Sequence, residues 1–223
     1  MLWSNCMDRC DVEQFLDSIT PLLVRSRKAR RRLAPRFNVF DAIGGERGEL
    51  MHSRFLACLL DPSGMHDQGP ELLASFLRLA LGETVSDTVL ASSRVVTEYH
   101  LGPNGRLDIV ILLPDGRIIG IENKIDASEG DNQIPRYQAW LAERSPTAPG
   151  RQLLVFLTPE GRDPVAVDPK TGVPCVSLSY SSIANWLRGC SESAPRLQVV
   201  LEMYSHLCER IGGTAGWTRL PNS

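Results

Sequence analysis

The chain has very little lysine: of its 24 basic residues, 21 are arginine and three are lysine, namely Lys28, Lys124 and Lys170. It also has no long apolar run, because the longest, residues 109–114, is far shorter than the ~20 residues that span a bilayer. Internal repeats and low-complexity tracts are absent as well. We therefore expect neither a membrane protein nor a repeat or disordered protein. A residue type used this sparingly is informative, so each lysine is a candidate for a specific role.

The six cysteines show no pattern that points to a metal or redox site. There is no Cys-x-x-Cys pair, and no Cys pair lies near a His pair at zinc-ligand spacing. Cys58 and Cys175 lie within apolar stretches, where a thiol behaves as a small hydrophobe. Residues 1–13 contain no apolar segment of the kind that a signal peptide needs. These features predict reduced thiols and a cytoplasmic location.

The composition is that of a globular protein, with 43% apolar and 22% charged residues. We expect one domain over residues 1–223, with a helical N-terminal extension (1–45), a core (46–158) and a C-terminal strand and helices (159–223). Residue periodicity predicts helices over 11–33, 46–60, 70–81, 132–143, 181–189 and 195–211, and strands over 93–101, 106–113, 117–124, 152–158 and 173–179. Such mixing predicts an α/β fold, in which helices cover both faces of a mixed sheet.

The hairpin over residues 106–124 is the most informative segment, and its turn decides which side chains share a face. A two-residue turn at 115–116 would set Asp108 opposite Asn123, and the nearby carboxylates would point to opposite faces. A three-residue loop at 114–116 sets Asp108 opposite Glu122 instead, with Cβ atoms about 4.5–5.5 Å apart. The loop sequence Pro-Asp-Gly suits a type I turn followed by a left-handed glycine. We therefore predict the three-residue loop.

With that loop, Asp108, Glu122 and Lys124 share one otherwise apolar face. Two carboxylates and an ammonium are costly to bury unless something binds there. Hard oxygen ligands from adjacent strands suit Mg²⁺, for which Mn²⁺ can substitute, with water and substrate oxygens completing the shell. Such an ion can activate water and neutralise a phosphodiester under attack, and a lysine can orient the attacking water. A purely structural cluster of acids and lysine fits the same spacing, which by itself does not separate the two.

Asp108 followed by Glu122-Asn123-Lys124 resembles the motif of the PD-(D/E)XK nuclease superfamily, also called restriction-endonuclease-like. The family core runs helix, three-strand meander, helix, strand, which matches the order expected over residues 46–158. One departure is Leu107, which replaces the proline that often precedes the motif Asp. The resemblance covers about half of the chain, and the sequence is similar in detail to one bacterial subgroup of the superfamily. It implies the αβββαβ core of the restriction-endonuclease-like fold.

The resemblance also implies further site residues. Many members add a glutamate from the first core helix, where this chain has Glu49. An exonuclease branch carries Gln-x-x-x-Tyr after the lysine, which here is Gln133 and Tyr137, one turn apart on one helix face. The candidate catalytic residues are therefore Glu49, Asp108, Glu122, Lys124, Gln133 and Tyr137, and the candidate metal ligands are Asp108, Glu122, the carbonyl of Asn123, and Glu49.

The function that the resemblance implies is Mg²⁺-dependent hydrolysis of DNA phosphodiester bonds, in bacterial defence or repair. Two alternatives stay open: a catalytically inactive nucleic-acid-binding or scaffold protein on the same fold, and a nuclease that acts on RNA. Inactive members usually lose the lysine or an acid, whereas this chain keeps them all, which favours the enzyme. A chain of this size has little room for a specificity domain, so loops, a second subunit in a homodimer, or a partner protein is expected to select the target. No membrane partner is expected.

Three further features leave alternatives open. Residues 25–32 carry six basic side chains, which could bind phosphates or form a solvated helix face. Because the net charge is −2, any nucleic acid must be held by local basic surface. Glu98 could be a further metal ligand or pair with an arginine at the strand edge. His52, Ser53 and His66 lack a partner that the sequence identifies, so they stay outside the candidate site.

Overall fold

The chain divides into two compact units, residues 1–38 and 39–223. The computed structural model describes residues 9–34, 36–144, 151–190 and 194–213. In the first unit, helix α1 (Arg9–Leu33) is continuous through Pro21. The predicted N-terminal extension runs to residue 45, whereas the second unit already begins at residue 39. Phe40 and Gly45 are both buried within this second unit. A single domain over the whole chain stays a prediction.

The second unit consists of a five-stranded sheet and the helices that pack on it. The strands are β1 (Arg94–His100), β2 (Arg106–Leu112), β3 (Ile118–Asn123), β4 (Gln152–Thr158) and β5 (Cys175–Ser179). The α-helices are α2 (Val39–Ala42), α3 (Glu49–Leu60), α4 (Glu71–Leu81), α5 (Asp87–Ala91), α6 (Gln133–Glu143), α7 (Tyr180–Gly189) and α8 (Pro195–Ile211). Within the described residues, the unit also has the short 3-10 turns η1 (Gly45–Arg47), η2 (Gly102–Asn104) and η3 (Pro169–Thr171).

The elements agree closely with those predicted from periodicity. The expected strands are all present, and each long helix lies within a few residues of its predicted range. The helix predicted from residue 46 begins only at Glu49, because Gly44 and Gly48 cap a separate 3-10 turn and glycine is a poor helix former. The short helices α2 and α5 were not predicted, since a single turn carries too little periodicity to detect.

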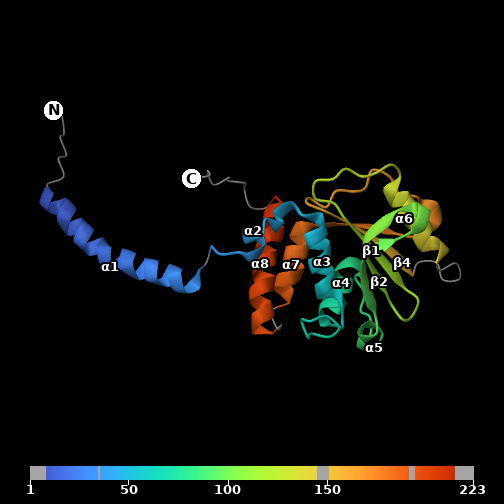
Figure 1. The fold of residues 1–223 in the computed structure, drawn as a ribbon, viewed down its shortest axis with the longest axis horizontal. Helices are drawn as coiled ribbons and strands as arrows, with labels where there is room; N and C mark the ends of the chain where they lie inside the picture. Colours follow the sequence, from blue (N-terminus) through green and yellow to red (C-terminus); the bar gives the residue numbers. More distant parts are fainter. Residues whose placement is uncertain (1–8, 35, 145–150, 191–193, 214–223) are drawn as a thin grey trace. The chain divides into compact units, whose positions relative to one another are not determined.

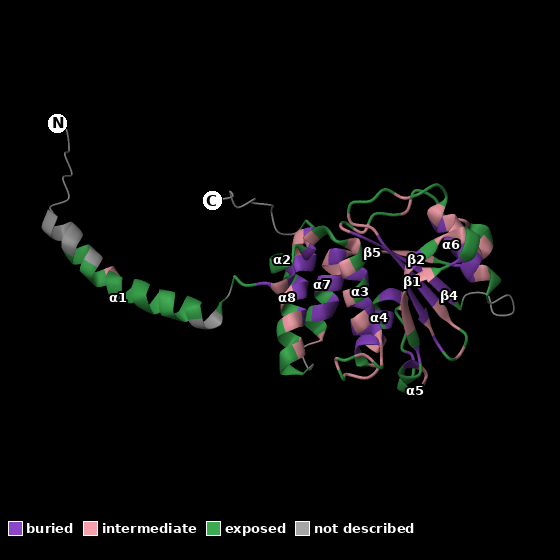
Figure 2. Ribbon diagram, viewed as in Figure 1, coloured by how far each residue is buried: buried purple, intermediate pink, exposed green. Residues whose placement is uncertain are grey.

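The sheet is mixed, with the strand order β1-β2-β3-β4-β5. The first three strands form an antiparallel meander, whereas β3 and β4, and β4 and β5, pair in parallel. Helices α3, α4, α7 and α8 pack on one face, and α6 covers the other (Figure 1). The central strands β2, β3 and β4 are mostly buried between these layers, whereas the edge strands β1 and β5 are mostly half-buried (Figure 2). The predicted α/β fold with helices on both faces is confirmed. No helix of the described residues is both long and apolar enough to cross a bilayer.

The β2–β3 hairpin has the predicted three-residue loop. The N–H of Leu113 donates to the carbonyl of Arg117 at 2.9 Å, and Gly116 adopts the left-handed region with φ +90°. The ladder then pairs Val110 with Gly120 and continues by one further pair, Ile109 with Ile121. The next step along both strands brings the two motif carboxylates to the same level of the sheet.

Leu107, the residue at the motif position that often holds proline, packs beneath this end of the hairpin. It is fully buried, and its side chain occupies the space above Gly120. A Cβ atom on Gly120 would lie 2.8 Å from Cδ1 of Leu107 and 3.2 Å from Cδ1 of Leu154. The glycine therefore makes room for the leucine, and this pair sets the packing under the candidate site.

Candidate active site

Asp108 lies where the β2–β3 ladder ends. Its Oδ2 accepts the backbone N–H of Asn123 at 2.8 Å, so a side-chain carboxylate takes the place of a ladder carbonyl. Burial raises the pKa of Asp108, although this hydrogen bond and the charge of Lys124 oppose the rise. The carboxylate is thus fixed in orientation at the point where the two strands part.

Glu122 is buried with its two oxygens in different surroundings. Its exposure is only 2%. Oε1 accepts from Nε2 of Gln133 at 2.7 Å and lies 3.0 Å from Nζ of Lys124. Oε2 is also buried, but no atom of the described residues donates to it. Burial, reinforced by the nearby Asp108 carboxylate, raises the pKa of Glu122 to about 8. One oxygen of a buried carboxylate therefore lacks an electropositive partner.

Lys124 follows the last residue of β3, and its side chain is only 15% exposed. Its backbone N–H donates to the carbonyl of Leu157 at 2.9 Å, which continues the parallel pairing with β4. Burial acts against the ammonium charge, but the hydrogen bond to Glu122 and the combined attraction of Glu122, Glu49 and Asp108 outweigh it, so the pKa of Lys124 is raised. The lysine is an ammonium at neutral pH and acts as a compact hydrogen-bond donor within the site.

Gln133 and Tyr137 lie one turn apart on α6 and extend the network to β2. Nε2 of Gln133 donates both to Glu122 and to the Tyr137 hydroxyl, the latter at 2.9 Å. Oε1 of Gln133 accepts the N–H of Gly130 at 3.1 Å. The Tyr137 hydroxyl donates to the carbonyl of Arg106 at 2.7 Å. The amide therefore has a defined orientation, and α6 contacts the same oxygen of Glu122 as Lys124 does.

Glu49, at the start of α3, contacts the loop that follows β3. Its Oε1 accepts three consecutive backbone N–H groups, those of Ile125 at 2.8 Å and of Asp126 and Ala127 at 3.1 Å each. One oxygen of the carboxylate is thus committed to the loop next to Lys124. Oε2 is the oxygen that a cation in the site would have to use.

The side chain of Asn123 points away from the carboxylates and joins the sheet to the helices on its other face. Its Nδ2 donates to Oγ of Ser53 and to the carbonyl of Glu49, both at 3.2 Å. Its Oδ1 accepts from the Tyr180 hydroxyl at 2.8 Å. Sequence reasoning missed Tyr180, because this contact depends on how α7 packs against the sheet and no local pattern reveals it.

The features left open by the sequence are also placed. Glu98 forms an ion pair with Arg106 at 2.9 Å and lies 4.0 Å from Arg54, so the arginine pairing is confirmed. His52 is fully buried, its Nδ1 lies 2.8 Å from the Tyr204 hydroxyl, and burial lowers its pKa to about 4. That geometry gives His52 a packing role away from the carboxylates.

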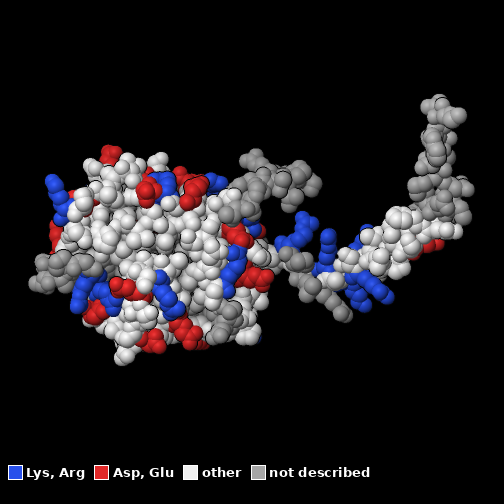
Figure 3. All heavy atoms as spheres, turned by 180° about the vertical axis from the view of Figure 1, so that it is seen from behind, with Lys and Arg blue, Asp and Glu red and all other residues white. Residues whose placement is uncertain are grey.

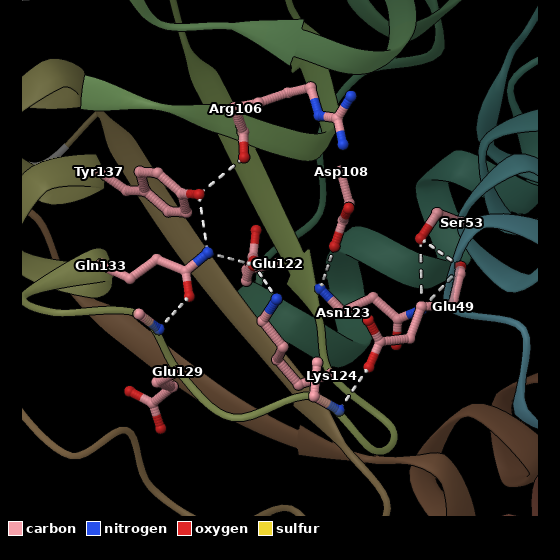
Figure 4. A network of polar contacts seen from close by, with 12 residues as sticks. Glu49, Ser53, Arg106, Asp108, Glu122, Asn123, Lys124, Glu129, Gln133 and Tyr137 are labelled. Atoms are coloured by element: carbon pink, nitrogen blue, oxygen red, sulfur yellow. Dashed lines mark hydrogen bonds and ion pairs between the residues drawn. The ribbon is translucent and has the colours of Figure 1, made fainter. Parts of the chain in front are cut away.

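The six residues predicted from the sequence meet in one polar network (Figure 4). Asp108, Glu122 and Lys124 come from the hairpin, and Glu49, Gln133 and Tyr137 come from the two helices that flank it. No group of three or more His, Cys, Asp or Glu side chains is placed to hold a metal ion in the described part of the chain. The two hairpin carboxylates fit Mg²⁺ nonetheless, because this ion takes one or two protein carboxylates and completes its shell with waters and substrate oxygens.

Comparison with known protein families gives one match, over residues 37–208, to a family model described as the PD-(D/E)XK nuclease superfamily. The matched range covers well over half of the chain and includes each of the six candidate residues. No curated protein and no solved structure matches the chain.

Proposed function

Because this chain belongs to the PD-(D/E)XK nuclease superfamily, whose members generally use divalent metals, we propose that it is a Mg²⁺-dependent nuclease that hydrolyses DNA phosphodiester bonds. The observation that carries the proposal is the asymmetry of Glu122. One of its oxygens has two hydrogen-bond donors, and the other is buried with none among the described residues. A buried carboxylate oxygen in that state is costly, and a cation removes the cost.

The residues that would hold the ion are Asp108, Glu122, the carbonyl of Asn123, and Oε2 of Glu49. Oxygen donors of this kind suit Mg²⁺, and Mn²⁺ is expected to substitute. When bound, such an ion supplies positive charge against the phosphodiester and acidifies water. The raised pKa values of Asp108 and Glu122 support this assignment, since both carboxylates lack sufficient positive charge in the protein alone.

The remaining residues would position the reacting groups. Lys124 donates to Glu122 and keeps further N–H bonds to offer, so it can orient the attacking water and contact the scissile phosphate. Gln133 and Tyr137 hold Glu122 in place through fixed hydrogen bonds and would lie beside the phosphate. Positioning of this kind typically contributes a large part of nuclease catalysis, because little covalent chemistry is left to the protein.

The test is incubation of the purified full chain with single- and double-stranded DNA and RNA, with Mg²⁺, with Mn²⁺ and with EDTA. Cleavage of DNA that requires the metal and is lost in Asp108→Ala and Lys124→Ala supports the proposal. Cleavage that survives in both variants would show that the site is elsewhere. Cleavage of RNA alone, or binding without cleavage of any substrate, would establish one of the two alternatives.

A further inference from the structure

Positive charge is divided very unequally between the two units. Residues 1–38 contain eight Lys or Arg and four Asp or Glu, a net charge of +4. Residues 39–223 contain sixteen Lys or Arg and twenty-two Asp or Glu, a net charge of −6. The unit that holds the candidate active site is therefore a polyanion, like its proposed substrate. Long-range electrostatics oppose their association unless basic surface elsewhere compensates.

That basic surface lies in the second half of α1, at residues 25–32, which we call the basic segment. Six of its eight residues are Lys or Arg, and no Asp or Glu occurs between Asp17 and Asp41. The basic side chains that the structure describes there are all exposed, namely Arg25, Arg27, Lys28, Arg30 and Arg31. Figure 3 shows Lys and Arg side chains gathered along α1, whereas both signs are interspersed on the visible face of the other unit.

The spacing within the basic segment is unfavourable for an isolated helix. Arg27 and Arg31 are four residues apart, and Arg25 and Lys28 are three apart, so like charges face each other. Each such pair of like charges destabilises an isolated helix. Asp17 lies too far along the helix to neutralise any of them. A bound polyanion would remove this repulsion, whereas a neutral partner would not.

We propose that the basic segment binds the phosphate backbone of nucleic acid and supplies most of the affinity that brings substrate to the negatively charged unit. The inference rests on the proposed function, because it takes nucleic acid as the substrate. Arginine and lysine that contact phosphates hold a nucleic acid without reading its sequence. The basic segment would thus increase binding to all sequences alike and leave cleavage at the active site unchanged.

An anionic membrane is the competing partner, because Leu22, Leu23 and Val24 are exposed next to the basic segment. Nucleic acid is favoured by the charge of residues 39–223. A net charge of −6 on the unit with the active site opposes the approach of nucleic acid, so a separate phosphate-binding element would serve a nuclease, whereas this charge offers no reason for a membrane contact. Vesicles are therefore included as an arm of the test.

The experiment compares the wild-type chain with the triple variant Arg27→Gln, Lys28→Gln and Arg31→Gln. These positions share one face of α1, and glutamine keeps a similar helix propensity. Binding of a fluorescent DNA duplex is measured in EDTA, which prevents turnover, over a series of salt concentrations. We expect binding weakened on the order of tenfold or more, and a slope of log K against log salt smaller by about 2 to 3. DNA binding should slow amide hydrogen exchange over residues 25–32 in the wild type but not in the triple variant.

A matched control removes three exposed arginines from residues 39–223: Arg78→Gln, Arg94→Gln and Arg196→Gln. The control should change affinity and salt slope much less than the α1 variant. In the presence of Mg²⁺, the α1 variant should raise KM and leave kcat near the wild-type value. An equal loss in both triple variants, or none in the α1 variant, would overturn the inference.

The remaining outcomes separate this inference from the proposed function. If DNA is cleaved and the α1 variant behaves as wild type, only the role of the basic segment fails. If nothing is cleaved and binding still depends on the basic segment, only the nuclease activity fails. Binding to phosphatidylglycerol vesicles that requires the basic segment, together with DNA binding that does not, would replace nucleic acid by a membrane.

Discussion

Oε1 of Glu49 lies 2.8 Å from the backbone nitrogen of Ile125, so the first residue of α3 holds the residue directly after Lys124. Two further N–H groups of the same loop converge on this oxygen. In this arrangement Glu49 is an anchor for the loop as well as a candidate metal ligand. Binding a metal ion needs the negative charge of Glu49, whereas anchoring the loop needs only an oxygen that accepts hydrogen bonds.

Replacement of Glu49 separates these roles. Glu49→Gln keeps a carbonyl oxygen that can accept the three N–H bonds, whereas Glu49→Ala removes the acceptor. If the anchor dominates, we expect the alanine variant to lose roughly 10²-fold in kcat through misplacement of Lys124, and the glutamine variant to lose only a few-fold. The measurement is kcat on DNA as a function of Mg²⁺ concentration. A glutamine variant as impaired as the alanine variant, with a raised Mg²⁺ requirement, would assign Glu49 to the metal instead.

Asp108 also has two roles that substitutions can separate: its oxygen accepts a hydrogen bond from the backbone of Asn123, and its negative charge is proposed to bind the metal ion. Asp108→Asn keeps an oxygen for the N–H of Asn123 and removes the negative charge. We expect its activity to fall on the order of 10³-fold while its unfolding free energy stays within about 1 kcal/mol of wild type. Asp108→Ala should lose activity equally and also about 1–3 kcal/mol of stability, because the buried N–H of Asn123 loses its partner. Urea unfolding and cleavage assays on both variants test this, and equal stability of the two would contradict it.

Tyr137→Phe tests the hydrogen bonds that join α6 to β2. The substitution leaves the carbonyl of Arg106 and one N–H of Gln133 without the hydroxyl, so we expect a loss of about 1–3 kcal/mol in unfolding free energy. Cleavage should fall only a few-fold, since Gln133 still donates to Glu122. The matched control is Tyr99→Phe, because Tyr99 packs against the ring of Trp140 at a centroid distance of 5.6 Å and contributes mainly through its ring. An equal loss in both variants would refute the role of the Tyr137 hydroxyl.

The register of the hairpin could be predicted from the sequence because one short loop decides it. Pro114, Asp115 and Gly116 each suit one position of a three-residue loop, and the strands must then bring Asp108 and Glu122 level. Continuous apolar runs identified the central strands, because a strand that is buried on both faces consists of consecutive apolar residues. The level positions of Asp108 and Glu122 on the two strands were therefore predictable without any tertiary information.

The supporting contacts could not be predicted, because they join residues far apart in the chain. The hydrogen bond from Tyr180 to Asn123 depends on the position of α7, and the contact of Glu49 with the loop after β3 depends on the tilt of α3. The asymmetry of Glu122 likewise emerges only when α6 and Lys124 are both in place. Contacts of this kind follow from packing, which residue spacing does not encode.

Gly120→Ala tests the packing beneath the site. The added Cβ would meet Cδ1 of Leu107 at 2.8 Å, so the leucine must shift in a fully buried position. We expect a loss of about 1–3 kcal/mol in unfolding free energy, as for overpacked cores. Gly189→Ala is the control, because nothing lies within 4 Å of its Cβ and alanine is the better helix former at the end of α7. Equal stability of the Gly120 variant and wild type would show that Leu107 is free to move.

The raised pKa of Glu122 makes stability depend on pH in a defined direction. Between its ordinary pKa of 4.5 and about 8, the metal-free folded state keeps a proton on Glu122 that the unfolded state has lost. The folded state therefore binds more protons, and the unfolding free energy falls as the pH rises through this window. Lys124 does not counteract this, because its pKa is raised from 10.5 and it titrates above the window.

Glu122→Gln removes this titration, so we expect the variant to gain stability relative to wild type as the pH rises from 4.5 to about 8. Urea unfolding in EDTA at several pH values measures the difference. Added Mg²⁺ should stabilise the wild type at the upper end of the window, where Glu122 is most readily deprotonated, and should have little effect on the variant. If the unfolding free energies of the two proteins change in parallel with pH, Glu122 is ionised in the folded state throughout this pH range. The unpartnered Oε2 would then need another source of positive charge.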